Sequence, residues 1–363
     1  MQSTSSNNAN NHLNNKSIYS MAIIFLLLAV VGFAYVKWVP YYAKAFAAQT
    51  NHSIGDSIIY GKAGSAPAVS LGAAIDYAIA YSKSIWKAMI LGLLLGSGIK
   101  VLLPTYWVSN LLGRIGFKSV IRGSLLAIPC MMCTCCAAPV AAGMRQSRAS
   151  VGSVVAWWLA NPLLNPATIV FMGFVLGWGW AMFRAIFGVG MVLGIAYLAE
   201  RYANPSAKPS AKPSELHLHS QPILGDEPAP TNHFLKRWLA EFMRMTIRLI
   251  PEYIILVLLL GAARAWLFPV FGNDANVLWI LAMAVAGMLF VIPTAGEVPI
   301  VQAMFALGVG AGPAAALMMT LPAVSLPSLI MLGRSFSIKM RMLIATGVVF
   351  SGIAAGFIAK LIF

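Results

Sequence analysis

Apolar runs of membrane-spanning length recur along most of this chain of 363 residues. A helix needs about 20 apolar residues to cross the hydrocarbon core of a bilayer. Only 10% of the residues are charged, whereas an ordinary soluble domain has about 25%. Alternating strand patterns of about ten residues, typical of outer-membrane barrels, do not occur. We therefore expect an all-α, polytopic transmembrane protein.

The apolar runs set the expected order of spans. Residues 21–36 predict an uncleaved first helix, since the rival signal-peptide cleavage site at 45–47 lies too far beyond the run. Residues 40–83 are expected to form a polar loop. The later runs lie at about 84–103, 167–182, 185–199, 250–268, 277–292, 297–309, 311–332 and 342–362.

Composition divides the chain into four segments. Residues 1–16, rich in Ser and Asn, are expected to be disordered. Residues 17–200 form a first membrane half, and 235–363 form a second, which opens with an interfacial helix at 234–248. Between them, 201–234 repeats Ser-Ala-Lys-Pro and predicts a disordered linker. Its pair of histidines, His217 and His219, is interpreted as solvated.

The net charge of +15 would suggest nucleic acid in a soluble protein. Here the basic residues flank the apolar runs, as topology signals and lipid headgroup contacts do. The bilayer is therefore the expected partner, and nucleic acid is not.

The two membrane halves are weakly similar to one another. A gapless match at an offset of 160 residues runs from Pro139 to Gly173 and has six identities in 35 positions. Four of the six are Pro or Gly, which mark backbone geometry. Such paired, Pro-broken segments are typical of secondary transporters, although convergent hairpin patterning would give a similar match. We expect two related halves and roughly 8–11 membrane segments.

All four cysteines lie within seven residues. Soft thiols select soft or thiophilic metals and metalloids, in a trigonal or a linear site. A closed zinc site needs four tetrahedral ligands, which one short segment supplies poorly. A redox dithiol and small hydrophobic packing residues are the alternatives. The candidate substrate- and metal-binding residues are Cys130, Cys133, Cys135 and Cys136.

Three polar residues complete the candidate site. Glu297 is the only acidic residue from 275 to the C-terminus. A lone carboxylate in a membrane segment is costly, so a coupling role is expected, with a structural ion pair as the alternative. Asn161 and Asn165 each precede a proline. They are expected to line the substrate path, or else to cap a structural kink.

These motifs resemble the predicted permease family of the ArsP and YraQ type. The resemblance rests on Pro-Cys…Cys…Pro139-x-Ala-x-x-Met-Arg145, on Asn161-Pro-x-x-Asn165-Pro-Ala-Thr and on Ile292-Pro-x-x-Gly-Glu297-Val-Pro, and it covers about 84–362. It implies an inner-membrane permease, and characterised relatives export trivalent organoarsenicals. The cysteine segment departs from the family's usual short Cys-x-Cys-Gly pattern.

We therefore expect a secondary permease that exports a thiophilic metalloid or metal species, most readily a trivalent organoarsenical. No nucleotide-binding motif occurs, so transport would use a gradient or a partner protein, and neither a cofactor nor an enzymatic activity is expected. A membrane thiol-redox protein, a soft-metal transporter of the copper or zinc type and a non-transporting metal-sensing subunit are the rival interpretations.

Overall fold

The computed structural model describes residues 20–60, 67–205, 234–268 and 277–363. The predicted N-terminal disorder at 1–16 lies outside these residues, as do His217, His219 and most of the predicted linker. Every regular element in the described part of the chain is a helix. Seven of these helices are long and apolar enough to cross a membrane. The all-α, polytopic architecture is therefore confirmed.

Some spans are single helices and others are broken in the middle. The single ones are Ser20–Asn51, which contains a π-helical turn η1 (Ala34–Trp38) and ends as α2 (Val39–Asn51), α3 (Leu71–Val101), α9 (Trp178–Ala203), α10 (Phe234–Leu267) and α15 (Ile338–Ile362). The broken ones are α7 (Val151–Leu163) with α8 (Pro166–Val175), and α13 (Ala311–Ala323) with α14 (Leu326–Met331) and η6 (Leu332–Arg334). The shorter helices are α4 (Thr105–Leu112), α5 (Phe117–Ala127), η3 (Ile128–Cys130), α6 (Thr134–Gln146), α11 (Val277–Leu289) and α12 (Glu297–Ala306).

One sequence-based expectation is wrong. The polar loop at 40–83 is largely helical, because α2 continues to Asn51 and α3 begins at Leu71 behind the N-cap Ser70. The apolar face of this part of α3 buries Tyr77 and Tyr81, whereas its polar residues are exposed. Asp76 and Lys83 interrupt the apolar residues here, so a strict search for apolar runs misses the start of this helix.

The expected interfacial helix at 234–248 leads without a break into the next span. These residues are the first half of one continuous helix, α10, which runs through Pro251. Proline is tolerated inside transmembrane helices because neighbouring groups can satisfy the freed backbone. At the other end of the predicted linker, α9 extends as far as Ala203.

Helices α5 and α6 form a re-entrant hairpin rather than a span. The hydroxyl of Ser119, near the start of α5, and the backbone N–H of Ser150, before α7, both donate to the Leu112 carbonyl at 2.9 Å. The chain between them therefore leaves one side of the bundle and returns to it. In the second half α11 and α12 do the same, since Gly312 at the start of α13 packs against Ile280 of α11.

Helix boundaries confirm that the two halves are related. Helices α5 and α11 begin at Phe117 and Val277, and α9 and α15 begin at Trp178 and Ile338. Helices α7 and α13 share both ends, at 151–163 and 311–323. Each pair keeps the offset of 160 residues that the Pro and Gly identities predicted.

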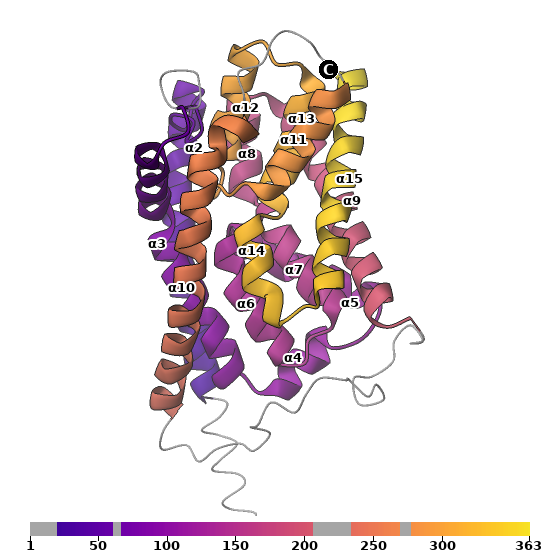
Figure 1. Ribbon diagram of the computed structural model, residues 1–363. Coiled ribbons are helices and arrows are strands. Elements are labelled where there is room, and N and C mark those ends of the chain that lie inside the picture. The colour runs from indigo at the N-terminus through magenta and orange to yellow at the C-terminus, as the bar shows by residue number, and fades with distance from the viewer. Residues whose placement is uncertain (1–19, 61–66, 206–233, 269–276) are drawn as a thin grey trace, which may run out of the picture.

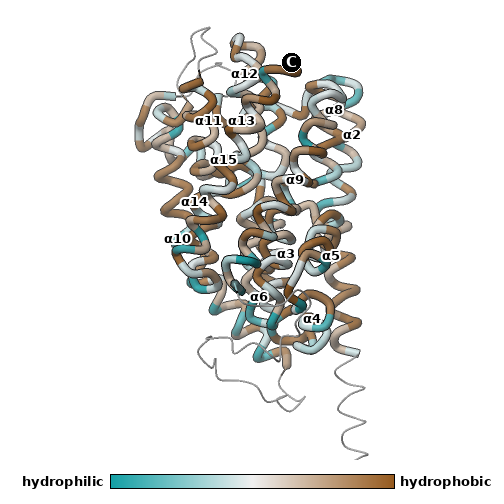
Figure 2. Tube along the Cα trace, turned by 90° about the vertical axis from the view of Figure 1, so that its right-hand side faces the viewer, coloured by the Kyte–Doolittle hydropathy of each residue, from teal (hydrophilic) through white to brown (hydrophobic). Residues whose placement is uncertain are grey.

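The halves are arranged with opposite orientations. In Figure 1, α6, α7 and α14 lie in the lower part of the bundle, whereas α12, α13 and α8 lie in the upper part. Helix α9 descends to the lower end, and α15 rises to the C-terminus at the top. Figure 2 shows mostly hydrophobic residues along the helices, with hydrophilic residues concentrated near the lower end around α4 and α6. This is the inverted-repeat arrangement of secondary transporters.

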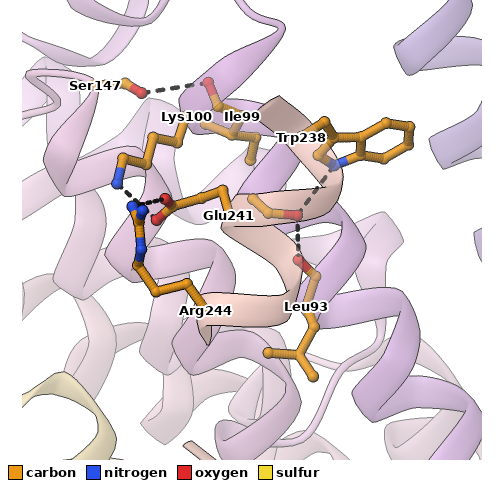
Figure 3. A network of polar contacts seen from close by, with 8 residues as sticks. Leu93, Ile99, Lys100, Ser147, Trp238, Glu241 and Arg244 are labelled. Carbon is orange, nitrogen blue, oxygen red and sulfur yellow. Dashed lines mark hydrogen bonds and ion pairs between the residues drawn. The ribbon is translucent and has the colours of Figure 1, made fainter. Parts of the chain in front are cut away.

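Contacts between α3 and α10 join the two halves without help from the linker. Glu241 of α10 receives the ammonium of Lys100 at 2.6 Å and the guanidinium of Arg244 at 2.8 Å (Figure 3). The indole of Trp238 donates to the Ser97 hydroxyl at 3.0 Å. These bonds accompany apolar packing along both helices, in which Gly261 lies against Tyr77.

Cutting the linker should therefore leave the halves associated. We expect fragments 1–215 and 216–363, expressed together, to copurify and to unfold within a few degrees of the intact chain, because polar linkers contribute little packing. Affinity purification through a tag on one fragment measures this. Stably inserted fragments that fail to copurify would contradict a passive linker.

Candidate transport site

The two hairpin tips and the two helix breaks meet around one small pocket, whose cavity volume is about 10 Å³. The first half contributes the residues before α6 and at the α7–α8 break, and the second half contributes the loop before α12 and the α13–α14 break. The lining residues are Cys133, Thr134, Pro162, Thr168, Ile292, Pro293, Thr294, Ala295, Glu297, Leu321 and Pro322. A pocket between inverted repeats is where secondary transporters hold their cargo.

The backbone at both hairpin tips is unusual. Met131 has φ = 50° and Ala295 has φ = 66°. Residues other than glycine rarely adopt this left-handed conformation, which costs about 1–3 kcal/mol and tends to persist at functional sites. The two halves thus break their helices in the same way on opposite sides of the pocket.

The four cysteines do not converge on one point. The sulfurs of Cys133 and Cys136 lie 3.1 Å apart and are buried. Cys133 is the N-cap of α6, and Cys136 follows three residues later, so both lie on one face of the helix. Cys135 faces Ser325 of the second half, with a sulfur–oxygen distance of 3.4 Å. Cys130 is partly exposed, and its thiol donates to the Leu126 carbonyl.

Within the described residues, no three His, Cys, Asp or Glu side chains are arranged to hold a metal ion. The geometry that exists is a close pair of thiols, Cys133 and Cys136. Two thiols suit a linear soft-metal centre, or two of the three bonds of a trivalent metalloid.

The asparagines lie behind the pocket and hold its backbone. The side-chain oxygen of Asn161 accepts the Met132 N–H at 3.3 Å, so it contacts the hairpin tip. That of Asn165 accepts the N–H groups of Ala167 and Thr168 and caps α8. Neither residue lines the pocket. The side-chain nitrogen of Asn165 has no hydrogen-bond partner among the described residues.

Glu297 forms a fully buried ion pair with Arg184 of α9, with a nitrogen–oxygen distance of 2.7 Å. The same guanidinium donates to the carbonyls of Pro162 at 2.8 Å and Met318 at 3.4 Å. Pro166 and Pro322, four residues further on, have no N–H to offer these carbonyls. Arg184 therefore satisfies a proline-freed carbonyl in each half and balances the only carboxylate of the pocket.

Lys37 is a second buried cation that the apolar-run analysis missed. It lies in the π-helical turn of the first helix, a feature that often marks functional sites. Its ammonium donates to the hydroxyl of Thr294, a pocket residue, at 3.0 Å and interacts electrostatically with the thiols of Cys133 and Cys136. In the sequence, Lys37 stands out only as a lone lysine directly after the first apolar run. Arg184 is likewise a lone cation between the apolar runs at 167–182 and 185–199.

Close helix packing fixes the cysteine helix in place. A Cβ added at Gly92 of α3 would collide with the Cys136 carbonyl, and one at Gly96 would collide with the Pro139 carbonyl. Small residues allow transmembrane helices to approach this closely.

Enlarging Gly96 should therefore disturb the thiols. We expect Gly96→Ala to lower stability by about 1–3 kcal/mol, the usual range for overpacking, and to slow labelling or ligand binding at Cys133. Gly190→Ala is the matched control, since nothing lies within 4 Å of its added Cβ. Thermal unfolding of both purified variants measures the difference. Equal midpoints would show that α6 does not depend on this contact.

Comparisons with known proteins agree with this geometry. The chain matches the ArsP_1 family, described as a predicted permease, over residues 17–164 and 70–361. It is 48% identical to the UPF0718 protein YraQ of Escherichia coli (strain K12) over 340 residues, which cover 93% of this chain and 94% of that one. The chain belongs to this permease family.

A more distant relative of the permease is the UPF0718 protein MJ0584 of Methanocaldococcus jannaschii, which is 26% identical over 76% of this chain and 91% of its own. No solved structure matches the permease. The family assignment and the seven membrane-length helices make the protein a multi-pass membrane transporter.

Proposed function

We propose that this permease exports a thiophilic metalloid or metal species across the inner (plasma) membrane, with trivalent organoarsenicals as the leading substrates. The observation that carries the proposal is the Cys133–Cys136 pair, 3.1 Å between sulfurs, at a pocket shared by both halves. Trivalent arsenic forms strong bonds to two neighbouring thiols, and oxygen ligands are poor substitutes.

The ion pair suggests how transport would be coupled. Glu297 joins the second half to Arg184 of the first. An ionisable pair between moving repeats can change its protonation or its partners during the cycle. Glu297 is therefore the proposed coupling residue, and an ion gradient is the proposed driving force for transport.

The experiment is arsenic flux into everted membrane vesicles or proteoliposomes. Methylarsenite uptake is followed by elemental mass spectrometry, with Cys133→Ser at matched protein level as the control. Gradient-dependent uptake by the wild type alone supports the proposal. Equal uptake by wild type and control, in energised vesicles, would refute it.

A thiol-redox role remains the second candidate, because two thiols 3.1 Å apart can also cycle between reduced and oxidised forms. It predicts electron exchange with a quinone or a thiol partner and no metalloid flux. Redox titration of the purified protein, in parallel with the flux assay, separates the two functions.

A further inference from the structure

The first helix, Ser20–Asn51, bonds both hairpin tips through two successive residues. The indole N–H of Trp38 donates to the Pro129 carbonyl at the first tip, at 2.7 Å. The ammonium of Lys37 donates to the Thr294 hydroxyl at the second tip, at 3.0 Å. Successive residues of a helix point about 100° apart. The two side chains therefore leave the first helix in different directions, one towards each tip.

The helix is irregular at these two residues. Ala34–Trp38 forms a π-helical turn, in which the N–H of Val39 bonds the Ala34 carbonyl, five residues back. A π-helical turn adds one residue to a helix, so it changes the direction in which the following side chains point. Such turns are rare and are frequent at functional sites. Lys37 and Trp38 are the last two residues of this turn.

The bond from Lys37 has a buried charge at one end. The side chain is 4% exposed, and its ammonium also lies 3.3 Å from the hydroxyl of Tyr41. A buried cation in a membrane segment is costly, and a hydrogen bond from a charged donor is about twice as strong as a neutral one. The contact with Thr294 therefore holds the second tip firmly against the first helix.

The first helix joins the two halves again at its other end. His52, directly after α2, donates from Nδ1 to the Phe174 carbonyl of α8 at 2.8 Å. Gln302 of α12 donates to the His52 carbonyl at 3.0 Å. Helix α8 belongs to the first half and α12 to the second. A helix outside the repeated pairs α5/α11, α7/α13 and α9/α15 thus bonds both halves at two levels.

The pocket between the tips is closed in this arrangement. Its cavity volume is about 10 Å³, which is room for about one water molecule. Cys133 lines it from the first tip and Thr294 from the second. A larger cargo molecule can enter only when the tips move apart. Because one helix bonds both tips, this movement must break at least one of the two bonds.

We propose that Lys37 and Trp38 are positioning residues that clamp the two hairpin tips together, and that the pocket opens to cargo when one of their bonds breaks. This inference rests on the proposed function in one respect, that the pocket is the transport site. It is independent of the chemical nature of the cargo.

Alkylation of Cys133 by N-ethylmaleimide tests the clamp in the purified full-length protein. This thiol is buried, so it reacts from opened molecules and its rate follows their population. Trp38→Phe keeps the aromatic ring, removes the N–H and changes no charge. We expect it to speed labelling about three- to tenfold, the usual effect of one neutral hydrogen bond on a two-state equilibrium. Tandem mass spectrometry resolves the four cysteines.

The second tip is tested by Thr294→Val. This variant removes the acceptor of Lys37 and leaves the lysine in place. We expect it to speed labelling of Cys133 at least as much as Trp38→Phe does, because the lost bond has a charged donor. Thr294→Ser keeps the hydroxyl and should restore the wild-type rate. If Trp38→Phe does not fold, the two threonine variants decide the question.

Two controls separate opening of the tips from general loosening. Trp266→Phe removes an indole of α10 that is 76% exposed, and it should label as the wild type does. Val348→Cys, added to each variant, places a thiol in the buried face of α15, away from both tips. Its labelling reports unfolding of the bundle and should stay at the rate measured in the otherwise wild-type protein.

The outcomes separate the clamp from the proposed function. Wild-type labelling of Cys133 in both Trp38→Phe and Thr294→Val overturns the clamp, and so does equal acceleration of Cys133 and the thiol at position 348. The labelling assay contains no metalloid. Faster labelling in a permease that transports no arsenical therefore supports the clamp and refutes the proposed function, whereas arsenical transport with unchanged labelling refutes the clamp alone.

Discussion

Replacing either Cys133 or Cys136 by serine should abolish resistance to trivalent arsenicals and reduce vesicle uptake to the level of empty membranes. Serine changes the volume little but removes the soft ligand, and each sulfur lies 3.1 Å from the other. Membrane abundance should stay near that of the wild type, since a substrate site is not needed to hold the helices together. The measurement is growth on graded methylarsenite, with protein levels quantified for each variant.

Cys130→Ser is the matched control, because this thiol is partly exposed and bonds only the Leu126 carbonyl; it should keep most of the resistance. Replacing each of the four cysteines by alanine in turn separates metalloid binding from the packing and redox alternatives. If the cysteines were simply small packing groups, alanine would be tolerated and serine would reduce abundance. If they formed a redox relay, activity would follow the redox buffer. Full resistance in a variant that lacks all four thiols would refute the hypothesis that the cysteines bind a metalloid.

Removing Arg184 should have the largest effect on stability. Arg184→Gln leaves the Glu297 carboxylate buried without its cation, which costs about 3–5 kcal/mol for a buried pair. It also weakens bonding to the proline-freed carbonyls of Pro162 and Met318. We expect a thermal midpoint far below that of the wild type, measured by fluorescence-detected size exclusion after heating.

Glu297→Gln should lower the thermal midpoint less than Arg184→Gln does. The amide oxygen still accepts a hydrogen bond from Arg184, and the guanidinium keeps its carbonyl partners. It should nevertheless slow transport strongly, since glutamine carries neither charge nor proton. The double variant Arg184→Gln, Glu297→Gln should recover part of the lost midpoint without recovering flux. Wild-type flux in the single glutamate variant would make Glu297 purely structural.

The sequence predicted the parts of the fold that repeat. The shared Pro and Gly positions at an offset of 160 residues correspond to real helix ends, such as those of α7 and α13. All four cysteines of the cluster lie at one helix break, and Cys133 lines the pocket. Residue spacing did not show which of them meet: Cys130 lies before the left-handed turn at Met131 and bonds the Leu126 carbonyl, whereas Cys133 and Cys136 lie after it and contact each other.

The charged partners were not predictable from local patterns. Arg184 meets Glu297 across 113 positions of sequence, and Lys37 meets Thr294 across 257. Only the tertiary arrangement brings such residues together. The start of α3 was missed for a simpler reason: Asp76 and Lys83 interrupt its apolar residues, and a search for uninterrupted apolar runs stops at such residues.

The inverted halves have one further consequence. If both halves carried the same side chains, the inward-open and outward-open states would be related by a two-fold rotation and would have equal energy. Here one tip presents sulfur and the other a carboxylate. The first helix, which brings Lys37 to one tip, lies outside the helix pairs α5/α11, α7/α13 and α9/α15 that the 160-residue offset relates. The energy difference between the two states of the empty transporter therefore comes from the side chains in which the halves differ, and not from the shared fold.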